Sequence, residues 1–274
     1  MLETADIWTA IVTGGAGGIG AAVCRKLASR GINVLVADLA DDNGHKLIDE
    51  LKSSYGVDAV FLHTDVSKEA DVVAMVNTAV QRWGRLDYAA NVAGICKDPP
   101  QEEQSLTTEL FDRHFEVNQR GVWLCQKYEA AQMLKQEPRA VKLHPEPQLG
   151  IRPQRGAIVN VASTTATTGM GFPAYAPTKR AVLAITKNGA KLYGAQGVRC
   201  NSIAPGATLT PMALAASDPE AYGEDSPYTQ PIALKTWAMP EEQAAVASFL
   251  LSAESSHVTG VNIMVDGGFA NTRP

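Results

Sequence analysis

The sequence predicts an α/β fold with one doubly wound parallel sheet and helices on both of its faces. Short apolar runs typical of strands alternate along the chain with longer amphipathic patterns typical of helices. The predicted strands end in polar or glycine-rich loops, and in a parallel sheet such loops gather at one edge, where ligands bind. The chain of 274 residues can bury a substantial core, and we expect residues 1–274 to form a single domain.

Composition and charge narrow the classes of function. The net charge of -5 gives no bulk attraction to nucleic acid or to an anionic membrane. No apolar run approaches the roughly 18 residues of a membrane helix, and residues 1–8 lack the basic start of a signal peptide. The four cysteines and five histidines are scattered without the spacing of a metal site. We therefore expect a cytoplasmic protein with free thiols and no bound metal.

A glycine-rich turn, residues 13–20, follows the first predicted strand at 7–12 and precedes a helical pattern. Its glycines, Gly14-x-x-x-Gly18-x-Gly20, have one more residue in the first gap than the commonest dinucleotide fingerprint. Glycines in such a turn let the backbone approach a pyrophosphate, which then lies at the helix N-terminus. The strand, turn and helix together predict a Rossmann-like dinucleotide site.

The second predicted strand ends at Asp38. An acid about 20 residues past the glycine turn can bind the adenosine ribose hydroxyls, and its charge repels a 2′-phosphate. Position 17 is glycine, and no basic residue follows Asp38 until Lys46. These features favour NAD over NADP. The alternative is that Asp38 only caps the next helix, although Asp41 and Asp42 are at hand to do so.

The other elements follow the same alternation of apolar runs and helical patterns. Prolines and acids suited to a first helical turn mark several helix starts. From these patterns we expect strands at 33–37, 59–62, 86–90, 157–162, 198–204 and 261–265, and helices at 42–54, from 67, at 106–135, at 174–193 and at 240–252.

The loops after the third and fourth predicted strands carry further candidate residues. Asp65, followed by Val66, either contacts the adenine amino group or only orders its turn. The stretch Asn91-Val92-Ala93-Gly94 is a turn of small residues, which lets the backbone lie against the cofactor ribose. Because both loops follow strands, we expect them at the carboxyl edge of the sheet, beside the glycine turn.

Two features stand out in the middle of the chain. Asn118 interrupts the helical region 106–135. Its side chain either forms a hydrogen bond with the backbone or with water and so bends the helix, or it is a polar residue that the helix tolerates. Segment 136–155 contains four prolines and several basic residues. We expect an exposed loop without regular structure there, either inert or in contact with a partner or another subunit.

The stretch from Ser163 to Lys179 carries the most specific chemistry. Tyr175 and Lys179 are four residues apart, so on a helix they share one face. Pro177 indicates that Tyr175 lies in the first turn, at the positive end of the helix. An ammonium and a helix end both favour the phenolate, so we expect a lowered pKa for Tyr175 and proton exchange with an alcohol or ketone. Ser163 could hold the same substrate oxygen.

The region after the strand at 198–204 is rich in proline, alanine and aromatic residues. It begins with Pro205-Gly206-Ala207-Thr208-Leu209-Thr210, and we expect residues 207–238 to form a substrate lid or ordinary loop packing. Apolar side chains here and before Tyr175 suggest an apolar, cyclic substrate, although such residues also form cores. They are Met170, Phe172, Met212, Leu214, Tyr222 and Trp237.

These motifs resemble, in residue type and order, those of the short-chain dehydrogenase/reductase family from about residue 7 to residue 269. The resemblance rests on residues 13–20, Asp65, Asn91-x-Ala93-Gly94, Asn118, Ser163, Tyr175-x-x-x-Lys179, Pro205-Gly206 with Thr210, and Asp266-Gly267.

By that resemblance, Tyr175 is the catalytic acid/base and Ser163 orients the substrate oxygen. Lys179 lowers the pKa of Tyr175 and binds the nicotinamide ribose, and Asn118 holds a water that relays protons from Lys179 to solvent. The implied cofactor contacts also include Gly14, Gly18, Ile19, Gly20, Asp38, Asp65, Val66, Asn91, Ala93, Gly94, Pro205, Gly206, Thr208 and Thr210.

The resemblance implies an NAD-dependent enzyme that interconverts a small-molecule secondary alcohol and a ketone by hydride transfer. Two alternatives keep the fold: a non-redox step in a biosynthetic pathway, and a dinucleotide-binding scaffold with vestigial chemistry. Family members are commonly tetramers or dimers, so we expect a homo-oligomer paired through the two helices that carry Asn118 and Tyr175.

The sequence departs from the family pattern in three places. Val92 stands where a second Asn is frequent, and segment 136–155 is longer than typical. Ser163 precedes Tyr175 by one residue fewer than usual, so Thr164 or Thr165 could take the role of the serine; we expect Ser163 to have it.

Overall fold

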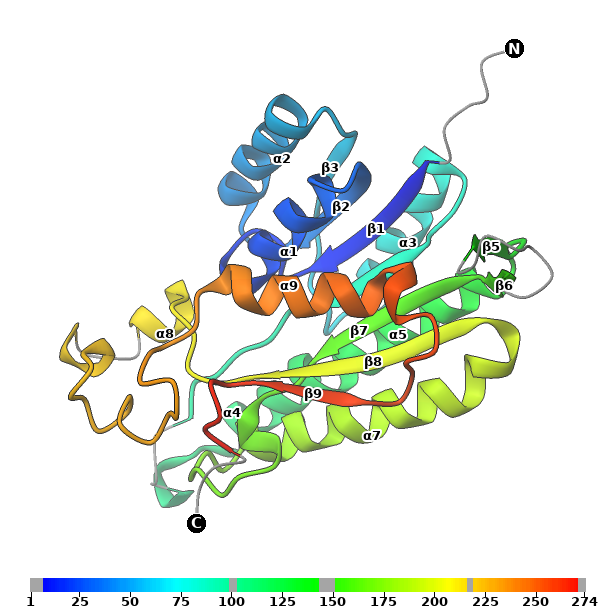
Figure 1. The fold of residues 1–274 in the computed structure, drawn as a ribbon. Helices are drawn as coiled ribbons and strands as arrows, with labels where there is room; N and C mark the ends of the chain where they lie inside the picture. Colours follow the sequence, from blue (N-terminus) through cyan, green and yellow to red (C-terminus); the bar gives the residue numbers. More distant parts are fainter. Residues whose placement is uncertain (1–6, 99–102, 143–150, 216–218, 271–274) are drawn as a thin grey trace.

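The computed structural model describes residues 7–98, 103–142, 151–215 and 219–270 of the chain. Its centre is a seven-stranded sheet in the order β3-β2-β1-β4-β7-β8-β9, in which all neighbouring strands are parallel (Figure 1). The strands are β1 (Trp8–Thr13), β2 (Ile32–Asp38), β3 (Ala59–His63), β4 (Tyr88–Asn91), β7 (Gly156–Val161), β8 (Val198–Pro205) and β9 (Asn262–Val265).

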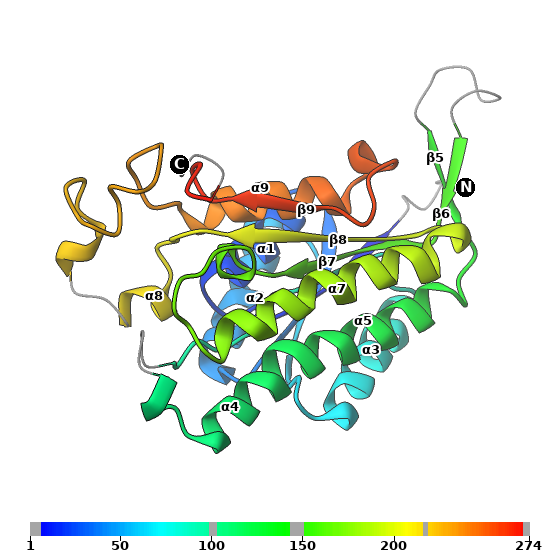
Figure 2. The same cartoon turned by 90° about the horizontal axis from the view of Figure 1, so that it is seen from below.

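Helices cover both faces of this sheet, which confirms the predicted fold class. Helices α1, α2 and α9 lie on one face, and α3, α5 and α7 lie on the other (Figure 1, Figure 2). The longer helices are α1 (Gly18–Ala28), α2 (Asp41–Tyr55), α3 (Glu69–Trp83), α5 (Val122–Met133), α7 (Tyr175–Tyr193) and α9 (Pro240–Leu251), and the short ones are α4 (Thr108–His114) and α8 (Pro211–Ala215). No helix in the described part of the chain is long and apolar enough to span a membrane.

Each central strand contributes to two cores, because successive side chains point to opposite faces of a sheet. In β1, Ala10 and Val12 belong to the core beneath α1 and α9, whereas Ile11 belongs to the core beneath α3 and α5. All three side chains are fully buried. This two-sided burial explains why the strands are continuous apolar runs in the sequence.

The helical region expected at 106–135 is divided by a π-helical turn, Phe115–Gly121, between α4 and α5. Asn118 lies at its centre. The Asn118 side chain accepts a hydrogen bond from the Ile95 N–H and donates one to the Ile95 carbonyl, both at 2.8 Å. The interruption expected at Asn118 is therefore present, and such wide turns are frequent at functional sites.

Segment 136–155, expected to lack regular structure, contains two paired strands. β5 (Arg139–Lys142) and β6 (Ile151–Gln154) are antiparallel, and they lie at the opposite end of the molecule from α8 (Figure 1). The Arg139 guanidinium donates to the Ile7 carbonyl at 2.8 Å and lies 4.4 Å from the centre of the Trp8 ring. These contacts hold the pair against the start of β1. Residues 143–150 lie outside the described part of the chain.

Candidate active site

The two residues expected to carry the chemistry lie in the first turn of α7. Tyr175 is the first residue of this helix, and Lys179 follows one turn later. Pro177 fits between them because the first N–H groups of a helix have no partner within the helix. The helix begins where the sequence predicted, at the carboxyl edge of the sheet beside the end of β7.

Lys179 is a buried cation. Its side chain is 3% exposed, and its Nζ donates to the Val161 carbonyl at 2.8 Å and lies 5.6 Å from the centre of the Tyr175 ring. Burial lowers the pKa of Lys179 to about 8, because the ammonium loses its hydration. Most Lys179 side chains therefore still carry their charge at pH 7.

The pKa of Tyr175 is shifted in the direction opposite to the one expected. We expected Lys179 and the helix end to lower it, but burial raises the pKa of Tyr175 above the ordinary value of tyrosine. The Cys96 thiol and the Asp98 carboxylate add to the rise, and the Ser163 hydroxyl opposes it. The Tyr175 side chain as a whole keeps part of its surface exposed, but its hydroxyl end is enclosed. A phenolate there loses its hydration, and the Lys179 ammonium does not offset that loss.

Ser163 is placed to share a substrate oxygen with Tyr175. Its hydroxyl forms a hydrogen bond with the Tyr175 phenol. The same hydroxyl accepts a hydrogen bond from the Thr165 N–H at 3.2 Å. The alternative residues Thr164 and Thr165 are both buried, and the Thr165 hydroxyl has no partner among the residues that the structure describes. The structure therefore brings Ser163 to the phenol despite the shortened spacing.

Asn118 and Lys179 face the same small space beside Gly94. A methyl group added to Gly94 would lie 3.1 Å from Asn118 Oδ1 and 3.2 Å from Lys179 Nζ. Glycine keeps this space open next to the loop that follows β4. A water held there would connect the two polar groups, and the proton relay expected from the sequence stays a prediction.

The glycine-rich turn has the shape and polarity that a pyrophosphate requires. Gly14 has φ +63°, and a Cβ on it would come within 2.8 Å of the Ala93 backbone; a Cβ on Gly20 would clash with the Gly14 carbonyl. Gly17, the N-cap of α1, provides no side-chain cap, and the first turn of α1 contains no acid. The helix start therefore presents backbone N–H groups and a positive dipole end without a competing carboxylate, which fits a dinucleotide phosphate.

Asp38 connects the glycine turn with the end of β2. Its Oδ2 accepts from the Ala16 N–H at 2.9 Å, and its Oδ1 accepts from the N–H groups of Leu39 and Ala40 at 2.7 and 3.0 Å. The carboxylate thus faces the turn and also orders the entry to α2. A carboxylate has acceptor capacity beyond these three bonds, so both roles expected for Asp38 are compatible.

Asp41 and Asp42, which were at hand to cap α2, do not cap it. The N-cap is Ala40, which has no side-chain cap, and both acids lie inside the first turn. Asp41 instead pairs with His63 at the end of β3, at 2.7 Å. Asp38 does not replace them as a cap, because it accepts from the N–H groups of Leu39 and Ala40, which precede the helix.

Two other candidates direct their side chains into the protein. Asp65 accepts from the N–H and the hydroxyl of Ser67, and one of its oxygens lies 3.4 Å from Arg113. Asn91 donates to Glu129 at 2.9 Å in a buried polar network. Asp65 orders its turn, and its contact with adenine stays a prediction because part of its side chain is exposed. A cofactor contact of Asn91 would come from its backbone. Ile19 packs against the core beneath α1, and Val66 and Ala93 pack against the core beneath α3.

Past β8, the chain folds over the carboxyl edge of the sheet (Figure 1). The Thr208 hydroxyl donates to the Gly206 carbonyl at 3.0 Å and accepts from Gln243 of α9 at 3.2 Å, so it is used within the protein. Thr210 lies beside the glycine turn, since a Cβ on Gly18 would be 3.2 Å from its side chain. Thr210 is therefore the better placed of the two threonines to meet a cofactor.

The region expected to form a lid packs through a small apolar cluster with buried Ile232, Trp237 and Phe269 at its centre. Of the six apolar residues proposed to meet the substrate, Met170, Tyr222 and Trp237 belong to this cluster, Phe172 meets the Tyr175 ring edge-on at 6.2 Å, and Met212 and Leu214 are exposed on α8. Apolar surface is therefore available beside Tyr175 and along the covering segment. Residues 216–218 of the expected lid lie outside the described chain.

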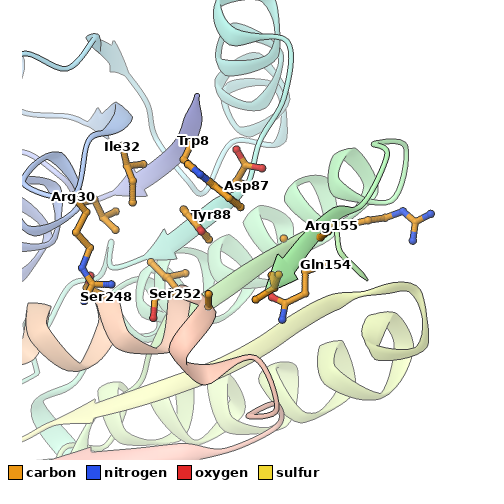
Figure 3. A pocket seen from close by; sticks show the side chains of 15 residues that line it. Trp8, Arg30, Ile32, Asp87, Tyr88, Gln154, Arg155, Ser248 and Ser252 are labelled. Atoms are coloured by element: carbon orange, nitrogen blue, oxygen red, sulfur yellow. The ribbon is translucent and has the colours of Figure 1, made fainter. Parts of the chain in front are cut away.

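A cavity of about 350 Å³ lies at the opposite, amino-terminal edge of the sheet (Figure 3). It is lined by residues at the starts of four strands, by the β5–β6 pair and by the end of α9. Trp8, Ile32, Tyr88 and Gly156 are the strand residues. Because Tyr175 and the glycine turn lie at the carboxyl edge, this cavity is separate from the candidate active site.

Two residues beside Tyr175 were missed at the sequence level, Asp98 and His114. Asp98 accepts from the Ala174 and Tyr175 N–H groups at 2.6 and 2.8 Å. His114, at the end of α4, lies 2.7 Å from the other oxygen of Asp98. The available signal was an acid four residues after Gly94, in a loop already assigned to the active edge of the sheet.

Comparisons with known proteins agree with this geometry. A family model described as enoyl-(acyl carrier protein) reductase matches residues 14–270. The (+)-borneol dehydrogenase 2 of Salvia officinalis is 34% identical to this chain and covers 96% of it, with 89% of its own length matched. The chain is a short-chain dehydrogenase/reductase.

Other similar proteins are named as a dehydrogenase and a reductase. A 2,5-dichloro-2,5-cyclohexadiene-1,4-diol dehydrogenase of Sphingobium indicum is 36% identical over 95% of this chain and 96% of its own. The crystal structure of levodione reductase superposes with a TM-score of 0.84 at 29% identity, covering 97% of this chain and 98% of that chain. This short-chain dehydrogenase/reductase is thus an oxidoreductase of alcohols or ketones that uses a nicotinamide cofactor.

Proposed function

We propose that this enzyme interconverts a secondary alcohol and a ketone with NAD, and that Tyr175 is its acid/base. The observation that carries the proposal is the first turn of α7, where one phenol interacts with the Ser163 hydroxyl and has the buried ammonium of Lys179 5.6 Å from its ring centre. The same edge of the sheet holds a glycine turn suited to a dinucleotide phosphate. The two halves of a redox site therefore lie together.

When bound, the nicotinamide supplies or accepts the hydride at the carbinol carbon. Tyr175 moves the proton: the phenol donates to the ketone oxygen in reduction, and the phenolate takes the alcohol proton in oxidation. Ser163 donates a hydrogen bond to the same oxygen and so holds it beside Tyr175. Lys179 gives the phenolate a positive neighbour and binds ribose hydroxyls, and Asn118 holds the relay water.

The raised pKa of Tyr175 determines the expected pH dependence of the two directions. At neutral pH the phenol keeps its proton, which suits the reduction of a ketone. Oxidation of an alcohol needs the phenolate, so its rate should rise as the solution becomes alkaline. Reduction should decline over the same interval, because the acid form of Tyr175 is then lost.

Asp38 supports the choice of NAD. Its carboxylate reaches the Ala16 N–H in the glycine turn, so a negative charge stands where a 2′-phosphate would come. Gly17, beside the phosphate position, has no atom within 4 Å of an added Cβ and brings no basic group. Backbone groups of Asn91, Ala93 and Gly94 are proposed to line the remainder of the cofactor.

We further propose an apolar ring alcohol or ketone as the substrate. The cluster around Trp237 and the edge-on contact of Phe172 with Tyr175 provide apolar surface near the phenol. Two relatives are named as dehydrogenases of a cyclohexadiene diol and of a 3beta-hydroxysteroid, which are ring alcohols. Segment 207–238 would act as the lid that encloses such a ring.

The proposed assembly is a homo-oligomer paired through α5 and α7. Large apolar side chains stand exposed on α4, the π-helical turn and α5, which is unusual for a surface facing only water. They are Phe111, Phe115 and Trp123, with 44%, 42% and 47% of their surface exposed. All four cysteines are free, which favours a reducing, cytoplasmic compartment.

The proposal is tested by Tyr175→Phe, with Tyr193→Phe at the far end of the same helix as the control. Wild type should form NADH from NAD⁺ and one or more alcohols of a panel of ring alcohols. Removing the acid/base should lower kcat by about a hundredfold or more, with NAD binding by fluorescence titration unchanged. The control variant should keep its turnover.

Undiminished turnover of Tyr175→Phe would refute the role of this residue. Tight NAD(H) binding without turnover on any alcohol or ketone of the panel would point to a binding protein. Product formation without a net change in NADH would point to a non-redox reaction.

A further inference from the structure

The first turn of α7 is capped by a carboxylate from a distant loop. Ala174, the N-cap residue, has no side-chain acceptor of its own. Asp98 instead accepts from the Ala174 N–H at 2.6 Å and from the Tyr175 N–H at 2.8 Å, across 77 residues of sequence for the second bond. Such a carboxylate satisfies helix N–H groups that otherwise lack a partner and interacts favourably with the helix dipole. The start of the helix that carries Tyr175 is therefore set by Asp98.

His114 packs against the second oxygen of Asp98. Its Nε2 lies 2.7 Å from Asp98 Oδ1, and both side chains are fully buried. The Lys97 N–H donates to the same Nε2 at 3.1 Å, so Nε2 is an acceptor there and its approach to Asp98 Oδ1 is a packing contact and not a hydrogen bond. The Nδ1 of His114 lies 2.8 Å from the Leu110 carbonyl within α4. Asp98 is thus enclosed between α4 on one side and α7 on the other.

The segment between β4 and Asp98 also carries residues proposed to line the cofactor. Ile95, three residues earlier, exchanges two hydrogen bonds with the Asn118 side chain, and Gly94 faces Asn118 and Lys179. The short run 94–98 is therefore bonded to the π-helical turn at one end and to α7 at the other. The distance between the Tyr175 phenol and this loop depends on both attachments.

Asp98 also affects the charge of the phenol. The titratable groups near the Tyr175 hydroxyl are Cys96, Asp98 and Lys179, and the Asp98 carboxylate is among the groups that raise the pKa of Tyr175. A neutral oxygen acceptor can also cap a helix. Asp98→Asn therefore separates the two effects, since it removes the charge and keeps one acceptor.

We propose that Asp98 is a positioning residue of this enzyme: buried against His114, it holds the first turn of α7 through the Ala174 and Tyr175 N–H groups, so that Tyr175 keeps its place against the loop proposed to bind the nicotinamide. The inference rests on the proposed role of Tyr175. Asp98 itself touches no reacting atom, and it acts on catalysis only through the backbone and the charge at the start of α7.

The experiment compares Asp98→Ala and Asp98→Asn with Asp112→Asn, which removes an exposed carboxylate from the neighbouring α4. Asp98→Ala should lower kcat about tenfold to a hundredfold through misalignment, with little change in the KM for NAD⁺. Asp98→Asn should recover a large part of that kcat. Both should shift the alkaline rise of alcohol oxidation to lower pH, because a negative charge beside the phenol is gone. Asp112→Asn should change neither quantity.

A role in folding alone would lower the melting temperature and leave kcat per folded molecule and the pH profile as in wild type, and that result would overturn the proposal. If Asp98→Ala does not fold, the pH shift of Asp98→Asn decides.

Failure of the proposed function is a separate outcome, recognised when wild type shows no turnover or when Tyr175→Phe keeps full turnover. In either case two measurements still test the positioning role. The first is the rate of hydrogen exchange of the Tyr175 amide in Asp98→Ala. The second is the pH titration of Tyr175 in Asp98→Asn, isolated by subtracting the tyrosinate absorbance of Asp98→Asn/Tyr175→Phe. Faster exchange and titration at lower pH than in wild type support the positioning role, and unchanged values reject it.

Discussion

Replacing Lys179 with methionine should make the protein more stable and inactive at the same time. Lys179 is 3% exposed, and burial lowers its pKa from 10.5 to about 8. At about 1.4 kcal/mol per pKa unit, keeping this ammonium charged at pH 7 costs the folded protein about 3 kcal/mol. Methionine has a similar volume and no charge, but the Val161 carbonyl loses its donor, which costs about 1 kcal/mol. We expect the free energy of unfolding to rise by about 2 kcal/mol.

The pH dependence of this gain follows from linkage. Below pH 8 the lysine is protonated in both the folded and the unfolded protein, so its cost is constant. Between pH 8 and 10.5 the unfolded chain holds the proton more tightly, so the cost falls as the pH rises. The advantage of methionine should therefore be largest below pH 8 and should reverse before pH 10.5, because the lost hydrogen bond still costs about 1 kcal/mol when the charge cost has gone. Phenols and thiols remote from Lys179 are common to both proteins and cancel in the difference. The Cys96 thiol does not cancel, because Lys179 lowers its pKa.

The assay is urea unfolding of wild type and Lys179→Met at pH 7 and near pH 10, together with NADH formation. Lys187→Met, an exposed lysine on the same helix, is the control and should change neither stability nor turnover by a measurable amount. The desolvation argument would be refuted if Lys179→Met were less stable than wild type at pH 7. It would also be refuted if the two proteins differed in unfolding free energy by the same amount at both pH values. Retained turnover would refute the catalytic role.

Two further predictions concern Glu129 and Asp38. Burial raises the pKa of Glu129 from 4.5 to about 8, so its contribution to stability is lost as the pH rises between these values. Glu129→Gln should therefore unfold in urea like wild type near pH 4.5 and be more stable, by on the order of 4 kcal/mol, above pH 8; an equal difference at both pH values would contradict this. Asp38→Asn should lower the ratio of kcat/KM for NAD to that for NADP by about tenfold or more, because a 2′-phosphate no longer meets a negative charge. An unchanged ratio would mean that Asp38 only orders its turn.

Elements with a local cause could be predicted from the sequence. The strands were recognisable because Ile11 and its neighbours are buried on both faces, which leaves an uninterrupted apolar run. The glycine turn was recognisable because Gly14 has a positive φ and touches the Ala93 backbone, which other residues cannot do without strain. The Tyr175–Lys179 pair followed from helical spacing alone.

Contacts between distant segments decided the features that could not be predicted. The β5–β6 pair looked like a loop because its prolines are a local signal, whereas Arg139 reaches Ile7 and the Trp8 ring far away in sequence. Pro153 is tolerated in β6 because this two-stranded pair has only edge strands.

The site shows the same division between local and distant causes. The sequence alone determined which residues share the active edge. The alternation of strands and helices along the chain, and the periodicity within each helix, are patterns of neighbouring residues. The tertiary structure decided that the pKa of Tyr175 rises and that Asp98 holds its helix, since hydration and capping depend on groups from other elements. Burial and through-space charge have no period along a chain, and they exist only once the chain has folded.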